Sequence, residues 1–107
     1  MLYMTIQTFN RQIQNIKKQL QNLGPMRPGT LTRQYRDPKK KIGPFHQISY
    51  TYRMKSRTEY VRPVFISKIQ EQIVNFKRFK KLIQRWIDLA LKLSKLQIDQ
   101  AKKNLEK

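Results

Sequence analysis

The stretch HQISYTYRMKSRTEYVRP (His46–Pro63) alternates polar and apolar residues, passes through a basic segment, and then alternates again. Because successive side chains of a strand point to opposite faces, this pattern predicts two antiparallel strands. Ile48, Tyr50 and Tyr52 share one predicted face. The side chains of the other predicted face are Gln47, Ser49, Thr51 and Arg53. The hairpin therefore separates an apolar face from one that can form hydrogen bonds.

The connection MKSRT (54–58) contains no glycine, so we expect a loop longer than the two-residue primed turn. This loop would hold Arg57, and Arg62 would end the returning strand. The tyrosines Tyr50, Tyr52 and Tyr60 have two interpretations. They can form the core against a helix, or they can stack single-stranded bases.

Upstream, LTRQYR (31–36) also alternates and predicts a third strand, followed by a loop over DPKKKIGP (37–44). Asp37 is explained by its position at the start of a turn, because Asp-Pro favours turn initiation. The three stretches together predict a small antiparallel sheet of two or three strands.

Helices are predicted on both sides of this sheet. Over residues 5–23, apolar residues recur at intervals of three and four, which is a heptad seam, and Gly24-Pro25 ends it. A second helix is predicted from Ser67 to about Asn104, with a Ser67/Gln70 capping box and Ile66 as a hydrophobic staple. The second helix is about twice as long as the first at 1.5 Å per residue. Either it breaks, or the sheet packs on part of it, or a second copy or another partner covers it.

Charge is the dominant feature of the composition. The 107 residues include 24 Lys+Arg and 6 Asp+Glu, giving a net charge of +18. Self-repulsion of this size favours a polyanionic partner, with nucleic acid the first candidate and an anionic membrane surface the second. The segment 27–62 is the most densely basic, with ten basic residues against two acids.

Several classes of function are disfavoured by what the sequence lacks. There is no cysteine, so disulfides and thiolate-bound zinc are excluded. The only histidine is His46, and the three glycines form no phosphate-binding loop. We therefore expect no catalysis, no cofactor and no metal. No apolar run is long enough to span a membrane, and MLYMTIQTF (1–9) lacks a cationic leader, so we expect a cytoplasmic, nucleoprotein-associated chain.

Strands that read a DNA groove present Arg, Gln, Ser and Thr from one face, while flanking lysines contact phosphates. On the predicted sheet that face also includes Thr32, Gln34 and Arg36. The basic helix segment FKRFKKLIQR (76–85) can lie along a phosphate backbone. The predicted nucleic-acid-binding residues are Arg33, Arg36, Lys39, Lys40, Lys41, Gln47, Ser49, Thr51, Arg53, Lys55, Arg57, Arg62, Lys77, Arg78, Lys80, Lys81 and Arg85.

Three short motifs carry a resemblance: GTLTRQYR (29–36), IGPFHQISY (42–50) and EYVRP (59–63), before a long basic helix. Together they resemble a group of small uncharacterised bacterial and archaeal proteins that are often encoded beside or inside mobile genetic elements. Members of that group typically carry a cysteine knuckle where this chain has DPKKKI (37–42). The order of strands followed by a helix is also similar to the arm-binding domains of tyrosine recombinases, whose sheets enter the major groove. The resemblance implies an accessory DNA-binding role.

The sequence thus predicts an α+β protein in three segments: a heptad helix (1–26), a basic sheet (27–64) and a long basic helix (65–107). The two helices are expected to pair within the chain or to complete a homodimer. The expected function is non-catalytic nucleic-acid binding, with duplex DNA favoured. The alternative is a structural RNA-binding protein of a ribosome or other ribonucleoprotein. A third possibility is a module whose heptad seam binds a helical protein partner.

Overall fold

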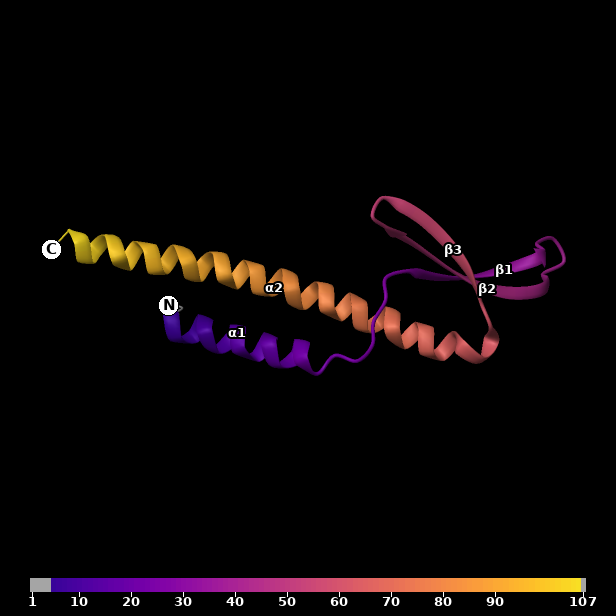
Figure 1. The fold of residues 1–107 in the computed structure, drawn as a ribbon, viewed down its shortest axis with the longest axis horizontal. Helices are drawn as coiled ribbons and strands as arrows, with labels where there is room; N and C mark the ends of the chain where they lie inside the picture. The colour runs from indigo at the N-terminus through magenta and orange to yellow at the C-terminus, as the bar shows by residue number, and fades with distance from the viewer. Residues whose placement is uncertain (1–4, 107) are drawn as a thin grey trace. The chain divides into compact units, whose positions relative to one another are not determined.

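A computed structural model describes residues 5–106 and has two helices and a three-stranded antiparallel sheet (Figure 1). The predicted α+β class and order of elements are confirmed. In chain order the elements are α1 (Ile6–Gln21), β1 (Thr30–Asp37), β2 (Ile42–Tyr52), β3 (Lys55–Val61), a 3-10 turn η1 (Pro63–Phe65) and α2 (Ile66–Leu105). The first residues of the amino-terminal stretch discussed above, 1–4, lie outside the described part.

The chain divides into two compact units that do not follow the three sequence segments. The helical unit combines the chain up to Leu23 with the residues from Phe79 onward, and the sheet unit is Gly24–Arg78. Helix α2 therefore contributes to both units. Each unit has its own hydrophobic core and is described separately below.

In the helical unit, α1 packs along α2 through the predicted heptad seam, and the two helices run antiparallel (Figure 1). Thr5 caps α1, because its side chain accepts a hydrogen bond from the Thr8 amide at 3.1 Å. The buried residues of this core are Phe9, Ile13, Ile16, Leu82 and Leu89. The expectation that this seam packs on a helix of the same chain is confirmed.

Helix α2 is continuous over 40 residues and does not begin as predicted. The 3-10 turn, in which the Phe65 amide donates to the Arg62 carbonyl at 2.9 Å, leads directly into the helix at Ile66. Ser67 therefore lies inside the helix, and the predicted capping box is wrong. Pro63 stands at the start of the 3-10 turn, where its fixed φ is compatible with helical backbone and a free amide is not needed.

In the sheet unit, the strand order is β1-β2-β3, with β2 in the middle. Leu31 of β1 pairs with Ile48 of β2, and His46 of β2 pairs with Val61 of β3. Directly paired residues point to the same face, so Leu31, Ile48 and Val61 lie together. We call this side the core face, because it packs against Ile73, Ile69 and Ile66 of α2. Ile48 is only 1% exposed, and the sheet does cover part of the long helix, as one of the three alternatives anticipated.

The segment 25–29, which connects the helical unit to β1, is held against α2 within the sheet unit. The Asn75 side-chain amide donates to the Pro25 carbonyl at 2.9 Å, and the Arg27 amide donates to the Gln72 carbonyl at 3.2 Å. The loop predicted over 37–44 is also shorter than expected, because β2 already begins at Ile42. Pro44 is tolerated there because β3 ends opposite His46, so β2 has a neighbour on one side only at that point. Asp37 accepts a hydrogen bond from the Lys40 amide at 3.3 Å, which confirms its role in the turn.

The β2–β3 connection is a two-residue turn, so the prediction of a longer loop is wrong. Arg53 and Met54 link Tyr52 to Lys55, with φ angles of 50° and 65°. Two consecutive positive φ values are typical of a type I′ turn, whose twist matches that of the flanking strands. Asn-Gly is the usual sequence for this turn, and neither residue is present here. The packing of the strands therefore outweighs the local preference of the turn residues.

Replacing Arg53 by Asn and Met54 by Gly is expected to raise the free energy of unfolding by about 1–2 kcal/mol, because left-handed backbone is costly for ordinary residues. Met54 is 98% exposed, so its replacement loses no packing, and the exposed contact of Arg53 with the Tyr52 ring is the only interaction removed. Urea unfolding followed by circular dichroism measures the change. The control Lys55→Gly, at a strand position without positive φ, is expected to lower stability by about 0.5–1 kcal/mol. A loss of stability in R53N/M54G would contradict the prediction.

Candidate nucleic-acid interface

The side of the sheet opposite the core face consists mainly of hydroxyl and amide side chains. We call it the polar face. Its hydroxyl and amide members on the three strands are Thr30, Thr32, Gln34, Gln47, Ser49, Thr51, Ser56 and Thr58. Arg36 lies on the same side at the end of β1, where its side chain passes over Gly43. The shared orientation of Gln47, Ser49 and Thr51 is as predicted. Phe45 and Tyr60 lie on the same side, paired with Gln34 and Gln47 respectively.

Cross-strand hydrogen bonds fix the geometry of the polar face. Ser49 and Thr58 hydroxyls are 3.2 Å apart, and those of Thr51 and Ser56 are 3.1 Å apart. Within β1, the Gln34 side-chain amide donates to the Thr32 hydroxyl at 3.4 Å. A hydroxyl has one donor and two acceptor positions, so each paired hydroxyl retains capacity for a further hydrogen bond. Between its ends the face is therefore an ordered surface of uncharged groups that can still bind a polar ligand.

Positive charge gathers at the two ends of β2. At one end, the β1–β2 turn carries Lys39, Lys40 and Lys41, with Arg36 close to it at the end of β1. At the other end, Arg53 lies in the two-residue turn, with Lys55 following in β3. The eleven residues of β2 give a span of up to about 35 Å at 3.2–3.4 Å per residue. Two basic turns thus border the polar face lengthwise.

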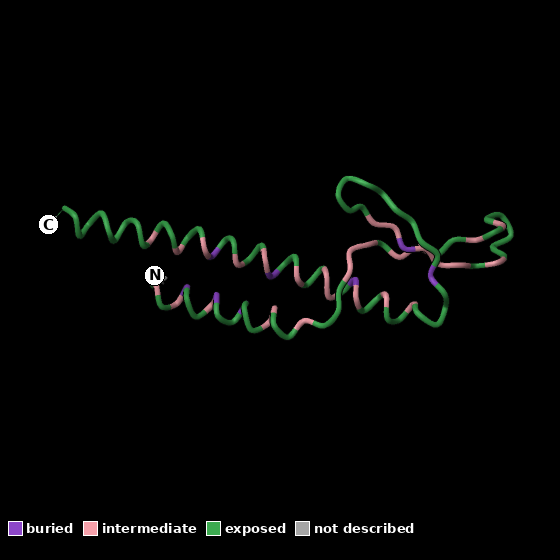
Figure 2. The backbone as a smooth tube through the Cα atoms, in the orientation of Figure 1, coloured by how far each residue is buried: buried purple, intermediate pink, exposed green. Residues whose placement is uncertain are grey.

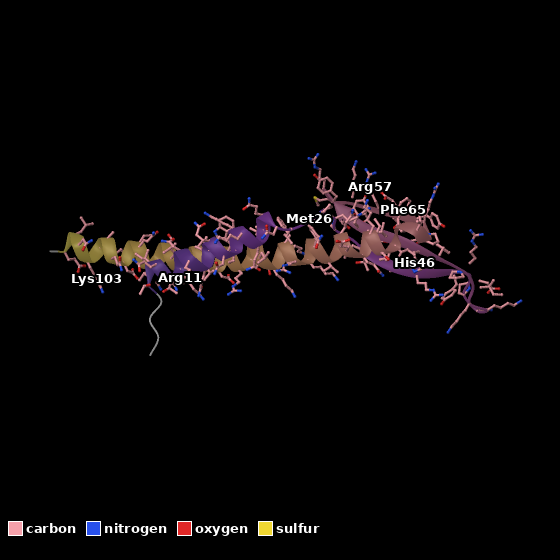
Figure 3. The ribbon with its side chains drawn as sticks, turned by 90° about the horizontal axis from the view of Figure 1, so that it is seen from below. Arg11, Met26, His46, Arg57, Phe65 and Lys103 are labelled. Carbon is pink, nitrogen blue, oxygen red and sulfur yellow. The ribbon has the colours of Figure 1, made fainter. Side chains whose placement is uncertain are left out.

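Two arginines are not where the sequence analysis placed them. Arg53 is a turn residue with its guanidinium 5.2 Å from the Tyr52 ring centroid, so it does not extend the polar face. Arg57 was expected in the loop but lies in β3, paired with Tyr50 (Figure 3). Both errors have one cause, because shortening the turn to two residues moves Lys55–Thr58 into the strand. Lys55, Arg57 and Arg33 consequently belong to the core-face side of the strands.

The three tyrosines neither fill the core nor share a platform. Tyr52 and Tyr60 are 59% and 61% exposed, so the core interpretation is wrong for both. Tyr60 pairs with Gln47 and Tyr52 pairs with Lys55, which places them on opposite faces of the sheet. Tyr50 is half-buried, and its hydroxyl donates to the Glu59 carboxylate at 2.9 Å. The partner of Glu59 is thus a tyrosine of the neighbouring strand.

Tyr52→Ala is expected to reduce the free energy of unfolding by less than about 1 kcal/mol, because only an exposed ring and its contact with Arg53 are lost. Tyr50→Ala is the matched comparison. It removes the bond to Glu59 and a ring that lies 5.1 Å from the Arg27 guanidinium, so its loss of stability is expected to be larger. Thermal unfolding of the two variants shows which of them loses more stability. Equal losses would show that Tyr52 is packed more tightly than its exposure indicates.

Arg27 is the residue of this region that sequence reasoning missed. Its guanidinium stacks over Tyr50, and it is half-buried. Arg27 and Tyr50 are 23 positions apart and belong to different predicted elements, so no local pattern indicates their contact. The only feature of the sequence that points to Arg27 is its position in the densely basic segment 27–62.

The basic residues predicted on the second helix are exposed, but they fall in two units. Lys77 and Arg78 belong to the sheet unit, whereas Lys80, Lys81 and Arg85 belong to the helical unit. Arg62 is exposed between β3 and the 3-10 turn. The sheet unit therefore contains fourteen of the seventeen predicted binding residues, and its polar face and turns form the candidate interface.

Possible metal ligands and membrane-spanning helices can be assessed within residues 5–106. There is no cluster of three or more His, Cys, Asp or Glu side chains that could hold a metal ion there. His46 is half-buried on β2, paired with Arg33 and Val61 (Figure 3). None of the helices in this described range has the length and apolar character required to cross a membrane.

Comparison of the chain with family models, with curated proteins and with solved structures finds no match. The geometry of the sheet unit and the charge of the chain are therefore the observations that bear on its function.

Proposed function

We propose that this protein is a non-catalytic nucleic-acid-binding protein that sets the polar face of its sheet in a groove of duplex DNA. The basic turns at the two ends of β2 contact phosphates on the flanks. The observation that carries the proposal is this combination of an uncharged hydrogen-bonding face with lysines and arginines at both of its ends.

The chemistry of the face suits the edges of base pairs. Glutamine makes paired hydrogen bonds to adenine in the major groove, and serine and threonine bond to several bases. The face has Gln34 and Gln47 on neighbouring strands among six hydroxyl side chains. Burying such a face costs little, because its groups can exchange water for base edges and no isolated charge is trapped.

The placement of charge suits the phosphates. The two basic turns are separated by up to about 35 Å, and one turn of B-DNA is about 34–36 Å long. Lysines in flexible turns position a protein on the backbone without reading sequence. The net charge of +18 also favours rapid association with a polyanion.

The resemblance of the strand motifs to mobile-element proteins supports a role as an accessory or regulatory DNA-binding subunit of a nucleoprotein complex. In such a role the sheet supplies binding and the enzyme is another protein. The wild-type chain should then bind duplex DNA without cleaving or rejoining it.

The test is a titration of the nucleic-acid-free protein with duplex DNA, duplex RNA and single strands at several salt concentrations. The logarithm of the binding constant should fall linearly with the logarithm of salt, with a slope of about −0.9 for each contacted phosphate of B-DNA. We expect about four or more phosphates, and the strongest binding to duplex DNA. Absent or salt-independent binding to all of the ligands would reject nucleic-acid binding.

A structural RNA-binding protein is the second candidate, and one observation favours it. The exposed Tyr52 ring, with Arg53 stacked on it, is a surface on which an unpaired base can stack. Stronger binding to single-stranded RNA than to duplex DNA, lost in Tyr52→Ala, would favour this candidate. Unchanged binding in Tyr52→Ala would remove its structural basis.

A further inference from the structure

The distal part of α2 carries a second apolar stripe that α1 does not cover. Its large members are between 52% and 86% exposed, and small residues fill the positions between them. We call this the distal stripe, and it consists of Ile87, Leu91, Ser94, Ile98, Ala101 and Leu105. At 100° per residue it lies about 140° around the helix from the residues that pack on α1. Figure 2 shows this end of α2 as largely exposed.

The charge of this segment differs from that of the rest of the chain. Residues 86–106 contain four lysines and three acids, a net charge of +1, whereas the whole chain carries +18. A helix that lies on an anionic membrane usually has a strongly basic polar face. Near-neutrality is instead compatible with a second copy of the same segment, because little like-charge repulsion opposes their contact.

The charges beside the stripe favour one orientation. Along one flank the order is Asp88, Lys95, Asp99 and Lys102, so the signs alternate. Two antiparallel helices related by a two-fold axis bring the same flank of each helix together, with the order of residues reversed. Parallel helices would bring together opposite flanks, and the other flank here is uncharged, with Gln97 and Asn104.

We propose that the distal stripe is a homodimer interface, in which α2 packs antiparallel on α2 of a second copy. In the matching register, Ile87 lies opposite the partner's Leu105, Leu91 opposite the partner's Ala101, and Ser94 opposite the partner's Ile98. At the four central pairings a large residue meets a small one, which allows the helices to approach closely there, while Ile87 and Leu105 meet at the two ends of the contact. Asp88 comes near the partner's Lys102, and Lys95 comes near the partner's Asp99. The dimer carries two polar faces, which would strengthen binding to a long duplex by avidity.

The contact does not depend on nucleic acid, so it is tested on nucleic-acid-free protein. Sedimentation equilibrium in about 1 M salt, where the Debye length is about 3 Å, removes long-range charge effects. The wild-type chain should have twice its monomer mass of 13.0 kDa. Leu91→Lys with Ile98→Lys should be monomeric, with dimerisation at least about 100-fold weaker, because two lysines then face the partner's apolar residues.

The matched control is Gln100→Lys with Asn104→Lys, which adds the same charge to exposed positions of the same helix outside the stripe. It should remain a dimer. Circular dichroism should show equal helix content in both double variants, since all four positions are exposed. A monomeric wild type at about 100 µM, or a dimer that survives L91K/I98K, would overturn the proposal. Equal dissociation of both double variants would also overturn the proposal.

The orientation has its own test, because the chain contains no cysteine. Leu91→Cys mixed with Ala101→Cys should give a disulfide-linked heterodimer under mild oxidation. Each variant alone should not, since equivalent positions lie about 15 Å apart along antiparallel helices, beyond the roughly 7 Å limit for a disulfide. Efficient self-linkage of Leu91→Cys would indicate a parallel dimer and overturn the antiparallel register.

Discussion

Ile48→Ala is expected to lower the free energy of unfolding of the sheet unit by about 3 kcal/mol, within the 2–5 kcal/mol observed for buried isoleucine and leucine truncations. Ile48 is on the central strand and contacts the cluster with Val61 and Ile73. The backbone of Gly29 also passes close by, since a Cβ placed there would lie 2.8 Å from the Ile48 Cδ1. Rigid neighbours on several sides limit how far the cavity can collapse, which favours a large loss.

Hydrogen exchange of the β2 amides measures this loss within the sheet unit. Fluorescence of Trp86, the only tryptophan, reports the helical unit and should change less. Ile42→Ala is the control, because Ile42 is on the same strand but is 58% exposed. It should cost less than about 1 kcal/mol. Similar losses in the two variants would mean that Ile48 does not anchor the sheet.

Replacing Lys39, Lys40 and Lys41 of the β1–β2 turn by glutamine is expected to weaken duplex binding several hundred-fold at about 0.1 M salt. Each lost phosphate contact reduces the log–log salt slope by about 0.9, so three contacts reduce it by about 2.7. Glutamine keeps much of the side-chain length and its polarity, and all three positions are exposed, so the fold should persist. Titration against salt gives both the affinity and the slope.

The control for this variant removes the same charge from the far part of α2, as Lys92→Gln, Lys102→Gln and Lys103→Gln. Charge at a distance contributes only a screened attraction, so we expect a loss of less than about tenfold and nearly the wild-type slope. Similar losses in both triple variants would mean that net charge alone drives binding. The β1–β2 turn would then not be part of the site, although nucleic-acid binding itself would stand.

Much of the fold could be predicted because it depends on local periodicity. The seam residues predicted from Phe9 to Leu23 are the ones that pack against α2 in the structure. The alternation of β2 correctly separates Ile48 from Gln47 and Ser49, because a strand has a period of two whatever surrounds it. The capping box at Ser67 was wrong because a 3-10 turn from Pro63 begins the helical backbone earlier than the local motif indicates.

The candidate site could be predicted only in part, because it depends on which residues of neighbouring strands pair with each other. The alternation that groups Gln47, Ser49 and Thr51 says nothing of which β3 residues face them. The two-residue turn sets that register, and it uses Arg53 and Met54 in a conformation that their own preferences disfavour. The positions of Arg57 and Tyr60 follow from it, so both were misplaced.

The sequence by itself determined the two helices, the existence of the sheet, the identity of its polar side chains and the strong positive charge. These features depend on spacing along the chain and on composition. Only the tertiary structure decided the hairpin register, the exposure of Tyr52 and Tyr60, the stacking of Arg27 on Tyr50, and the division of α2 between two units. The physical reason is that α2 covers the sheet only around Ile48 and Val61, so side chains beyond that contact stay exposed whatever their hydrophobicity. The hairpin His46–Pro63 is thus anchored at its base and exposed toward its turn.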